Sequence, residues 1–223
     1  MVVLFDLDGT LVDHEAGARA GAIAVHERLG LEGGSEAFCA AWRAALERHY
    51  ARYLEGHLSF EEQRRARVRE VVDATLDDRA ADEMFDVYLT AYEAAIPLFG
   101  DALVCLDRLS DHRLGIVTNG HTSRQRAKLE RHGLLERFEH VVTSEECGCA
   151  KPAGAIFRNA CGCFEARPED VVYIGDHYEV DAVGARSAGL RGVWLDRRGA
   201  AGSGHLPPLI RSLRDLPALL EDD

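Results

Sequence analysis

Five short apolar segments recur along the chain, and longer stretches of helical character separate them. Most of the segments are rich in β-branched residues and are followed by Gly, Asn, Asp or Ser. Short buried strands that alternate with helices form a parallel sheet with crossover connections, and loops at the carboxyl ends of the strands carry the functional site. The sequence therefore predicts an α/β fold with strands over 2–5, 114–118, 140–143, 171–174 and 192–195.

The region 14–96 differs from the rest of the chain. Ala, Arg, Glu and Leu dominate it, no strand pattern is found, and turn-forming clusters divide it into about four helices. The stretch SFEE at 59–62 has the pattern of a capping box at a helix start. We therefore expect an all-helical domain over 14–96, inserted into a core made of residues 1–13 and 97–223. Residues 199–204 are expected to form a flexible loop.

The composition narrows the classes of function. The formal net charge is −12, which argues against a nucleic-acid-binding surface. Apolar runs are far shorter than the ~20 residues that a membrane span needs, so we expect no membrane partner. The opening residues MVVLFD have neither the basic region nor the cleavage signal of an export peptide. We therefore expect a cytoplasmic protein.

The six cysteines do not suggest the disulfide framework of a small secreted protein. Cys147 and Cys149 form one Cys-Gly-Cys pair, and Cys161 and Cys163 form another. Structural zinc sites usually separate paired cysteines by two or more residues, and a helix expected over 153–161 would hold the two pairs apart. We therefore expect buried or incidental thiols rather than zinc ligands, and any further role of the pairs stays open.

Two aspartates, Asp6 and Asp8, follow the first apolar segment in the sequence FDLDGT. Strand alternation would place them on the same side of the chain, where their charges repel. A cation or a phosphoryl group between them would remove that objection. Three further chemistry-bearing stretches stand at strand ends or just before a helix: IVTNG at 116–120, Lys151–Pro152, and IGDHYEVD at 174–181.

These four stretches, in this order and spacing, resemble the haloacid dehalogenase superfamily of phosphohydrolases, in the branch with a helical cap inserted after the first motif (C1 cap, subfamily I). The resemblance covers essentially the whole chain. It implies a Rossmann-like three-layer core around a central parallel sheet, with the helical region as a cap over the site. Asp6 is then the nucleophile that forms an aspartyl-phosphate. Asp8 is the acid for the leaving group and later the base for the attacking water.

The resemblance also implies Mg²⁺ as the cofactor. Magnesium prefers oxygen ligands and keeps several waters. Asp6, the backbone carbonyl of Asp8 and Asp176 would hold the ion. Asp181 would orient a metal-bound water or pair with Lys151, although an acidic residue at a helix start is also favoured by the helix dipole alone.

The remaining site residues are expected to bind phosphate. Thr118 can hydrogen-bond a phosphate oxygen. The backbone amides of Asn119 and Gly120, at the entrance to the next helix, would form an anion-binding concavity. Lys151 would hold the phosphate and offset its repulsion from Asp6.

Asp8 favours phosphate monoesters as substrates, because a halide leaving group needs no proton and dehalogenating members of the superfamily lack this acid. We expect the partner to be a small phosphorylated metabolite: a nucleotide, a sugar phosphate or a phosphoglycolate-like compound. The alternatives are a phosphosugar mutase of the same superfamily, a haloacid dehalogenase, and an inactive binding protein. A phospho-signalling receiver is set aside, because such domains are far shorter.

Other residues give weaker evidence about which branch of the superfamily the chain resembles. Gln125 and Lys128, after VTNG, look most like the branch that holds nucleotidases and sugar-acid phosphatases. His177 departs from it, because many relatives carry Ser or Thr there, and its role stays open. The residues that select the substrate and the oligomeric state are also open. Candidates for selection are His14, Glu15, Arg64, Arg65 and Arg67, of which the arginines fit a solvated helix face better.

Overall fold

The computed structural model describes residues 1–199 and 207–221, so the loop expected over 199–204 lies, after Gly199, outside the described residues. The chain divides into two compact units. The core unit consists of Met1–Asp13 and Leu98–Asp223, and the helical unit consists of His14–Pro97. Each unit is considered by itself below.

A parallel sheet forms the centre of the core unit, with the strand order β3-β2-β1-β4-β5-β6. The predicted α/β class with a central parallel sheet is confirmed, and each of the five predicted strands is present within one residue of its expected bounds. The sixth strand, which has only two residues, was not predicted. The strands are β1 (Val2–Phe5), β2 (Arg113–Thr118), β3 (His140–Thr143), β4 (Val171–Gly175), β5 (Arg191–Leu195) and β6 (Leu209–Ile210).

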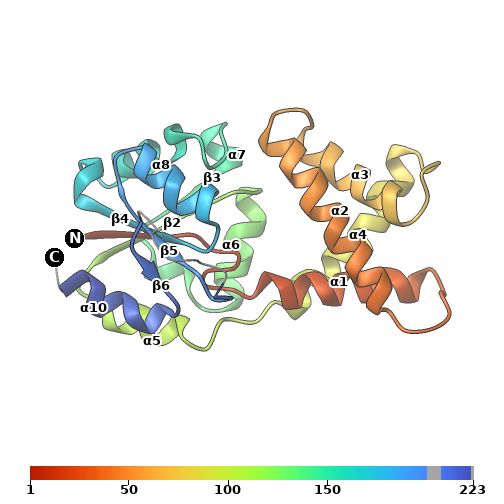
Figure 1. The fold of residues 1–223 in the computed structure, drawn as a ribbon, viewed down its shortest axis with the longest axis horizontal. Helices are drawn as coiled ribbons and strands as arrows, with labels where there is room; N and C mark the ends of the chain where they lie inside the picture. The colour runs from red at the N-terminus through yellow and green to blue at the C-terminus, as the bar shows by residue number, and fades with distance from the viewer. Residues whose placement is uncertain (200–206, 222–223) are drawn as a thin grey trace. The chain divides into compact units, whose positions relative to one another are not determined.

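Helices cover both faces of this sheet, which gives the core its three layers. Figure 1 shows α8 on one side and α5 and α10 on the other. Phe157 of α8 packs edge-to-face on Tyr173 of β4, with ring centroids 5.0 Å apart. The helices of the core unit are α5 (Ala102–Arg108), α6 (Thr122–Arg131), α7 (Ser144–Cys147), α8 (Gly154–Cys163), α9 (Gly184–Ser187) and α10 (Leu216–Glu221). Shorter helical turns are η1 (Leu135–Arg137), η2 (Pro168–Asp170), η3 (Tyr178–Val183, a π-helical turn) and η4 (Leu213–Asp215).

Strand β1 lies between β2 and β4, and this position places the predicted motifs together. Every residue of β1 is buried, as its sequence VVLF requires. Phe5 aligns with Ile116 of β2 and with Ile174 of β4. Because all three strands are parallel, the residues that follow them meet at one edge of the sheet. The polar residues after β1, β2 and β4 are therefore neighbours in space.

The helical unit is built from α1 (His14–Arg28), α2 (Glu36–Leu54), α3 (Phe60–Val71) and α4 (Asp78–Ala95). The predicted capping box at the start of α3 is present, with Ser59 and Glu62 exchanging their two hydrogen bonds. Aromatic rings dominate the centre of the unit: Trp42, which is 1% exposed, stacks on Tyr88 with centroids 4.9 Å apart. Among the residues described, no helix is long and apolar enough to cross a bilayer.

One part of the helical unit differs from expectation. Arg67 is not on a solvated face but is 4% exposed, and its guanidinium lies over the rings of Phe85 and Tyr88. Nη2 of Arg67 donates to Gln63 Oε1 at 2.9 Å. The helical period explains the difference, because Arg67 shares a face with Gln63 whereas Arg65 points elsewhere, toward acidic residues of α4.

Candidate active site

Asp6 directly follows β1, and its side chain is buried at the carboxyl end of the sheet. Its backbone N–H donates to the carbonyl of Ile174 at 2.8 Å, which continues the pairing with β4 by one residue. The carboxylate accepts hydrogen bonds from Lys151 Nζ at 2.6 Å and from Thr10 Oγ1 at 3.2 Å. Groups from three segments of the core unit therefore fix this side chain.

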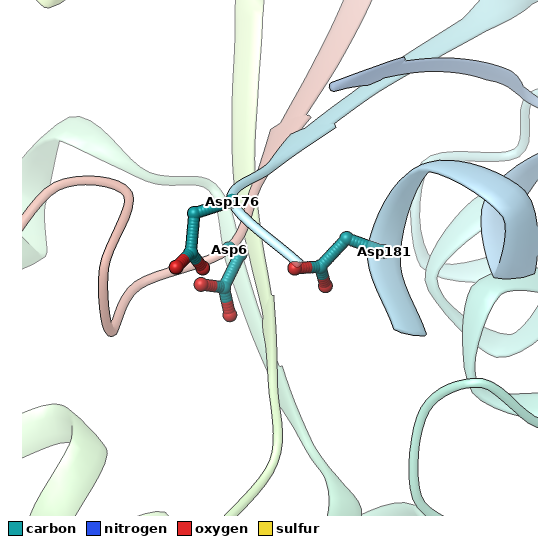
Figure 2. Close-up of side chains that lie close together, drawn as sticks. All are labelled: Asp6, Asp176 and Asp181. Atoms are coloured by element: carbon teal, nitrogen blue, oxygen red, sulfur yellow. The ribbon is translucent and has the colours of Figure 1, made fainter. Parts of the chain in front are cut away.

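Three aspartates converge at this point. Carboxylate oxygens of Asp6, Asp176 and Asp181 lie within 4.8 Å of one another. Figure 2 shows the three side chains pointing toward one another from the ends of β1 and β4 and from η3. Among the described residues, this is the only group of three or more His, Cys, Asp or Glu side chains close enough to hold a metal ion. Three of the predicted site residues are thus brought together.

Two glycines make this closeness possible. A Cβ on Gly9 would lie 2.3 Å from Asp176 Oδ2, and Gly9 also has a φ of +93°, which L side chains rarely adopt. A Cβ on Gly175 would lie 2.3 Å from Asp181 Cγ. Both glycines belong to the motifs FDLDGT and IGDHYEVD, and their missing side chains leave room for the carboxylates.

Lys151 supplies the positive charge of the cluster. Its ammonium group lies 2.6 Å from Asp6 Oδ1, 2.7 Å from Asp181 Oδ1 and 2.8 Å from the Tyr173 hydroxyl. The predicted pairing between Lys151 and Asp181 is therefore present. The backbone of Lys151 is held by the side chain of Asn119, whose Oδ1 accepts from Lys151 N at 2.8 Å and whose Nδ2 donates to Lys151 O at 3.1 Å. Asn119 thus positions the lysine, a role that its predicted backbone amide did not suggest.

Burial and an excess of carboxylates set the electrostatics of the cluster. Burial raises the pKa of Asp6 to about 7; the Asp181 carboxylate adds to this effect and Lys151 opposes it. Burial also raises the pKa of Asp176 well above its usual range, and the Asp6 and Asp181 carboxylates act in the same direction. Burial disfavours the charge on Lys151, but Asp181 and Asp6 outweigh burial and raise the pKa of this lysine. The cluster thus contains three carboxylates and one ammonium group, which hydrogen-bonds to two of them.

This charge imbalance fits a divalent cation. In the part of the chain that the structure describes, no side chain donates a hydrogen bond to the Asp176 carboxylate. Burial and the neighbouring carboxylates raise the pKa of Asp176, so its charged form lacks a compensating side-chain donor among these residues. Mg²⁺ prefers carboxylate oxygens, and its two positive charges would balance the excess. Asp6 and Asp176 are the side chains suited to hold it, beside an Asp181 that already binds Lys151. The residues present therefore fit the predicted metal.

Asp8 is held apart from the cluster by a second lysine. Lys128 Nζ lies 2.6 Å and 2.7 Å from the two oxygens of Asp8, and Gln125 Nε2 lies 3.0 Å from Asp8 Oδ2. In this structure each of the two carboxylates is bound by a lysine, and the expected cation or phosphoryl group between Asp6 and Asp8 stays a prediction. Strand β1 ends at Phe5, so strand alternation does not extend to Asp8, and each carboxylate has its own ammonium group.

The predicted phosphate-binding segment follows β2. Thr118 is buried at the end of that strand, and its Oγ1 lies 2.6 Å from Gln125 Nε2. The backbone N–H of Gly120 donates to Ser144 Oγ at 2.8 Å. Of the two backbone amides predicted to bind phosphate, that of Gly120 is therefore already paired within the protein, because the turn into α6 packs against the start of α7.

The structure gives contacts for His177 and for one of the cysteine pairs, whose roles were left open. The backbone N–H of His177 donates to Asp181 Oδ2 at 3.0 Å, and its Nδ1 accepts from Val180 N at 3.3 Å. His177 therefore caps η3, with its side chain exposed to solvent. The sulfur atoms of Cys147 and Cys149 lie 3.2 Å apart as free thiols.

Sequence reasoning assigned no role to four contacting residues, Thr10, Gln125, Lys128 and Tyr173. Tyr173 sits in an apolar strand segment, where nothing marks it as polar and functional. One signal was available for Lys128. Of the 26 basic Lys and Arg residues in the sequence, only Lys128 and Lys151 are lysines. In the structure each of them binds one aspartate of FDLDGT.

Residues 1–189 match the model of a family described as haloacid dehalogenase-like hydrolases. The chain belongs to this family, which confirms the resemblance predicted from its motifs. It is 34% identical over 201 residues to the ribulose-1,5-bisphosphate 5-phosphatase of Halopiger xanaduensis, covering 87% of this chain and 84% of that protein. It is 32% identical over 225 residues to the phosphoserine phosphatase of Thermus thermophilus, covering 88% of each.

The fold has a close counterpart among solved structures. The HAD-hydrolase YfnB of Bacillus subtilis, in a structure with bound magnesium, matches with a TM-score of 0.86 over 98% of this chain and 97% of that one. At 23% identity, this likeness concerns the fold. Together with the family, the two phosphatase relatives confirm the predicted class of enzyme: a hydrolase of the phosphatase type.

Proposed function

We propose that the chain is a magnesium-dependent phosphatase that cleaves small phosphate monoesters through an aspartyl-phosphate on Asp6. Phosphoryl transfer needs an in-line nucleophile, neutralised charge and a proton for the leaving oxygen. The observation that supports the proposal most is the cluster of Asp6, Asp176 and Asp181, whose oxygens lie within 4.8 Å of one another around one buried lysine. It offers a nucleophile and a site for charge neutralisation at the same place.

The reaction is proposed to proceed in two half-reactions. First, an oxygen of the Asp6 carboxylate attacks phosphorus, the bond from phosphorus to the leaving oxygen breaks, and that oxygen takes a proton from the Asp8 carboxyl group. Second, Asp8, now a carboxylate, takes a proton from a water molecule whose oxygen attacks phosphorus. The bond between phosphorus and Asp6 breaks, and the Asp6 carboxylate is restored. One ester and one water thus give one alcohol and one phosphate.

Lys151, Thr118 and the backbone amide of Asn119 are the groups we assign to the oxygens of the transferred phosphoryl group. Lys151 reduces the repulsion between a phosphate dianion and Asp6, to which it is already bound at 2.6 Å. Gly120 stays part of this turn through its φ of +142°, a backbone conformation that favours glycine, while its N–H remains on Ser144.

Asp6, Asp176 and the backbone carbonyl of Asp8 are the groups that we assign to Mg²⁺, with Asp181 beside them. The cation, when bound, neutralises charge on the nucleophile and on the phosphoryl oxygens. The protein's own contribution is to hold the carboxylates at the required closeness through Gly9 and Gly175.

The substrate class that we propose is a small phosphorylated metabolite. The two phosphatase relatives are named for esters of a sugar and of an amino acid, which are both small molecules. We assign the helical unit the role of a cap that selects the substrate and excludes water. The structure of YfnB, which is described as revealing interdomain movement, supports such a role by analogy of fold.

Phosphate release from a panel of nucleotides, sugar phosphates, phosphoserine and phosphoglycolate tests the proposal, with Mg²⁺ and with a chelator at equal protein concentration. We expect release that requires the metal, and the ranking across the panel identifies the substrate group. No release from any compound by folded protein would contradict the proposal. Conversion of a sugar phosphate to its isomer would indicate a mutase, and halide release from a 2-haloacid would indicate a dehalogenase.

A further inference from the structure

Lys128 and Gln125 lie one turn apart on α6, and both bind the carboxylate of Asp8. Lys128 Nζ contacts both oxygens of Asp8, at 2.6 and 2.7 Å. The pair is largely shielded from water, because the Lys128 side chain is 11% exposed and that of Asp8 is 25% exposed. An ion pair of this kind holds its partners more firmly than an exposed one. The proposed reaction assigns no task to either residue of α6.

Gln125 connects Asp8 to the segment that follows β2. Its Nε2 lies 3.0 Å from Asp8 Oδ2, 2.6 Å from Thr118 Oγ1 and 3.2 Å from the carbonyl oxygen of Asn119. The amide nitrogen has two hydrogens for these three acceptors, so the contacts share its donors. Gln125 is also buried. Gln125 therefore links the Asp8 carboxylate to Thr118.

The type of cation at position 128 is itself informative. The sequence contains 24 arginines and two lysines, and the other lysine, Lys151, binds Asp6. A guanidinium group is a rigid planar fork, whereas an ammonium group is a compact charge with three rotatable donors. An ammonium group can therefore hold the Asp8 carboxylate while that group turns toward a reacting oxygen. An arginine would fix the plane of the carboxylate.

We propose that Lys128 and Gln125 are positioning residues for Asp8, and that they determine how well the enzyme cleaves esters whose alcohol is a poor leaving group. This inference rests on the proposed function, in which Asp8 gives the leaving oxygen its proton. Lys128 and Gln125 act through Asp8 and do not themselves take part in the transfer.

Two esters whose alcohols differ in acidity can distinguish the positioning of Asp8 from general support of the fold. Phenol is a weak acid, so phenolate is a basic leaving group that needs a proton as it departs, whereas p-nitrophenolate is much less basic and leaves readily without one. Phenyl phosphate and p-nitrophenyl phosphate have similar shapes, so a loss of substrate binding or of folded protein affects both alike. A loss of proton donation slows phenyl phosphate selectively.

The experiment measures kcat/KM and kcat for these two esters, with Mg²⁺ present, in the wild type and in Lys128→Met and Gln125→Met. Because kcat/KM covers the steps up to the aspartyl-phosphate, it leaves out the hydrolysis step that both esters share. General acid catalysis contributes about 10²–10⁴-fold, so we expect Lys128→Met to lower kcat/KM on phenyl phosphate by ~10-fold or more. On p-nitrophenyl phosphate we expect a loss of kcat/KM below ~3-fold. Gln125→Met, which removes no charge, should also slow phenyl phosphate more than p-nitrophenyl phosphate, with an added loss common to both esters because the hydrogen bond to Thr118 is removed.

Arg126→Met is the matched control, because it removes an exposed cationic side chain from the same helix. We expect it to keep both activities. Equal losses of kcat/KM on the two esters in Lys128→Met would overturn the inference, since they indicate support of the fold or a contact with substrate. A higher kcat/KM on phenyl phosphate would overturn it too, because the ion pair would then oppose catalysis.

Asp8→Asn separates a failure of this inference from a failure of the proposed function. If Asp8→Asn lowers kcat/KM equally for both esters, the proposed role of Asp8 as the acid is wrong, because kcat/KM leaves out the hydrolysis step in which Asp8 is the base. If Asp8→Asn is selective and Lys128→Met is not, only the role of Lys128 is wrong. The double variant Asp8→Asn, Lys128→Met should be no slower on phenyl phosphate than Asp8→Asn alone, because positioning has no value once the acid is gone.

Discussion

The two units of this chain place their charges in opposite ways. In the helical unit, the ion pairs lie mostly on the surface, as where Arg65 binds Asp78 and Asp82 of α4, and aromatic rings fill the interior. In the core unit, the sheet is apolar but its carboxyl edge buries aspartates against Lys151. The helical unit thus keeps most of its charge where water solvates it, and the core unit buries several carboxylates, with the largest group at the carboxyl edge of the sheet.

The difference shows where in the chain charged groups lose their hydration on folding. Exposed ion pairs contribute little to stability, whereas buried charges persist only if partners compensate for their lost hydration. In the core unit much of this loss of hydration falls on Asp6, Asp181 and Lys151, which belong to the proposed active site. The helical unit has one exception in Arg67, over aromatic rings, where burial lowers the pKa of the guanidinium and Tyr88 and Tyr92 oppose this effect. Four substitutions test this contrast.

Asp6→Asn should have the largest effect, because it removes the nucleophile while leaving a side chain of the same shape. We expect kcat to fall by roughly 10⁴-fold or more, as for other removed nucleophiles. Turnover and far-ultraviolet circular dichroism, measured together, check that activity is lost while the fold stays. Activity near that of the wild type would end the assignment of Asp6 as nucleophile.

Trp42→Ala should be the most damaging change in the helical unit. Trp42 is 1% exposed and stacks on Tyr88, so truncation leaves a large cavity. We expect a loss of about 3–5 kcal/mol in the free energy of unfolding. Denaturant unfolding followed by circular dichroism measures this loss. A loss below ~1 kcal/mol would show that the aromatic interior of this unit is not what holds it together.

Asp101→Asn tests a buried charge in the core unit that is not one of the three clustered aspartates. Asp101 accepts two hydrogen bonds from Arg197, each at 2.9 Å, and others from Ser212 Oγ and Leu213 N. Burial acts to raise the pKa of Asp101, but these hydrogen bonds outweigh it and lower the pKa. The loss in the free energy of unfolding at neutral pH should be about 1.5–3 kcal/mol, because these bonds are made to a charged group.

The lowered pKa of Asp101 also predicts how the stability loss in Asp101→Asn changes with pH. Because the pKa of Asp101 is lowered in the folded state, its stabilising effect is present above the ordinary pKa of an aspartate, 3.8. It is lost as the pH falls through the lower folded value. The difference in stability between wild type and Asp101→Asn should therefore shrink on acidification below pH ~4. A difference that stays constant from neutral pH to pH ~3 would contradict the assignment.

Arg65→Ala should have the smallest effect, although the guanidinium makes three hydrogen bonds to Asp78 and Asp82. Both acidic partners are substantially exposed. We expect a loss of about 1 kcal/mol or less, reduced further at high salt. Thermal unfolding at two salt concentrations measures it. A loss above ~2 kcal/mol that salt does not reduce would remove the contrast between the units.

The fold could be predicted from the sequence because five of the strands have a recognisable local pattern of residues. β1 is a continuous apolar run that ends at an aspartate, and β2 and β4 end in Thr-Asn-Gly and Gly-Asp. β6 could not be predicted. It has two residues and exists only because the backbone of Trp194 and of Leu195 on β5 pairs with it. A strand of that length has no sequence period of its own.

The sequence predicted which residues form the site better than it predicted which of them contact one another. The motifs identify Asp6, Asp176 and Lys151 as residues that meet, and the structure brings them together. Which cation binds Asp8 could not be inferred, because Lys128 is 120 positions away on a helix with other basic residues. The side-chain role of Asn119 was hidden for a similar reason, since its hydrogen bonds to Lys151 bridge 32 positions.

The scarcity of lysine gives this enzyme an internal reporter. Isotopic labelling of lysine side chains would yield two ammonium signals, one from Lys128 beside Asp8 and one from Lys151 beside Asp6. Each signal reports on the surroundings of one aspartate of the FDLDGT motif. Nuclear magnetic resonance could therefore follow both members of the motif through metal binding and turnover, with no substitution and with the rest of the protein silent.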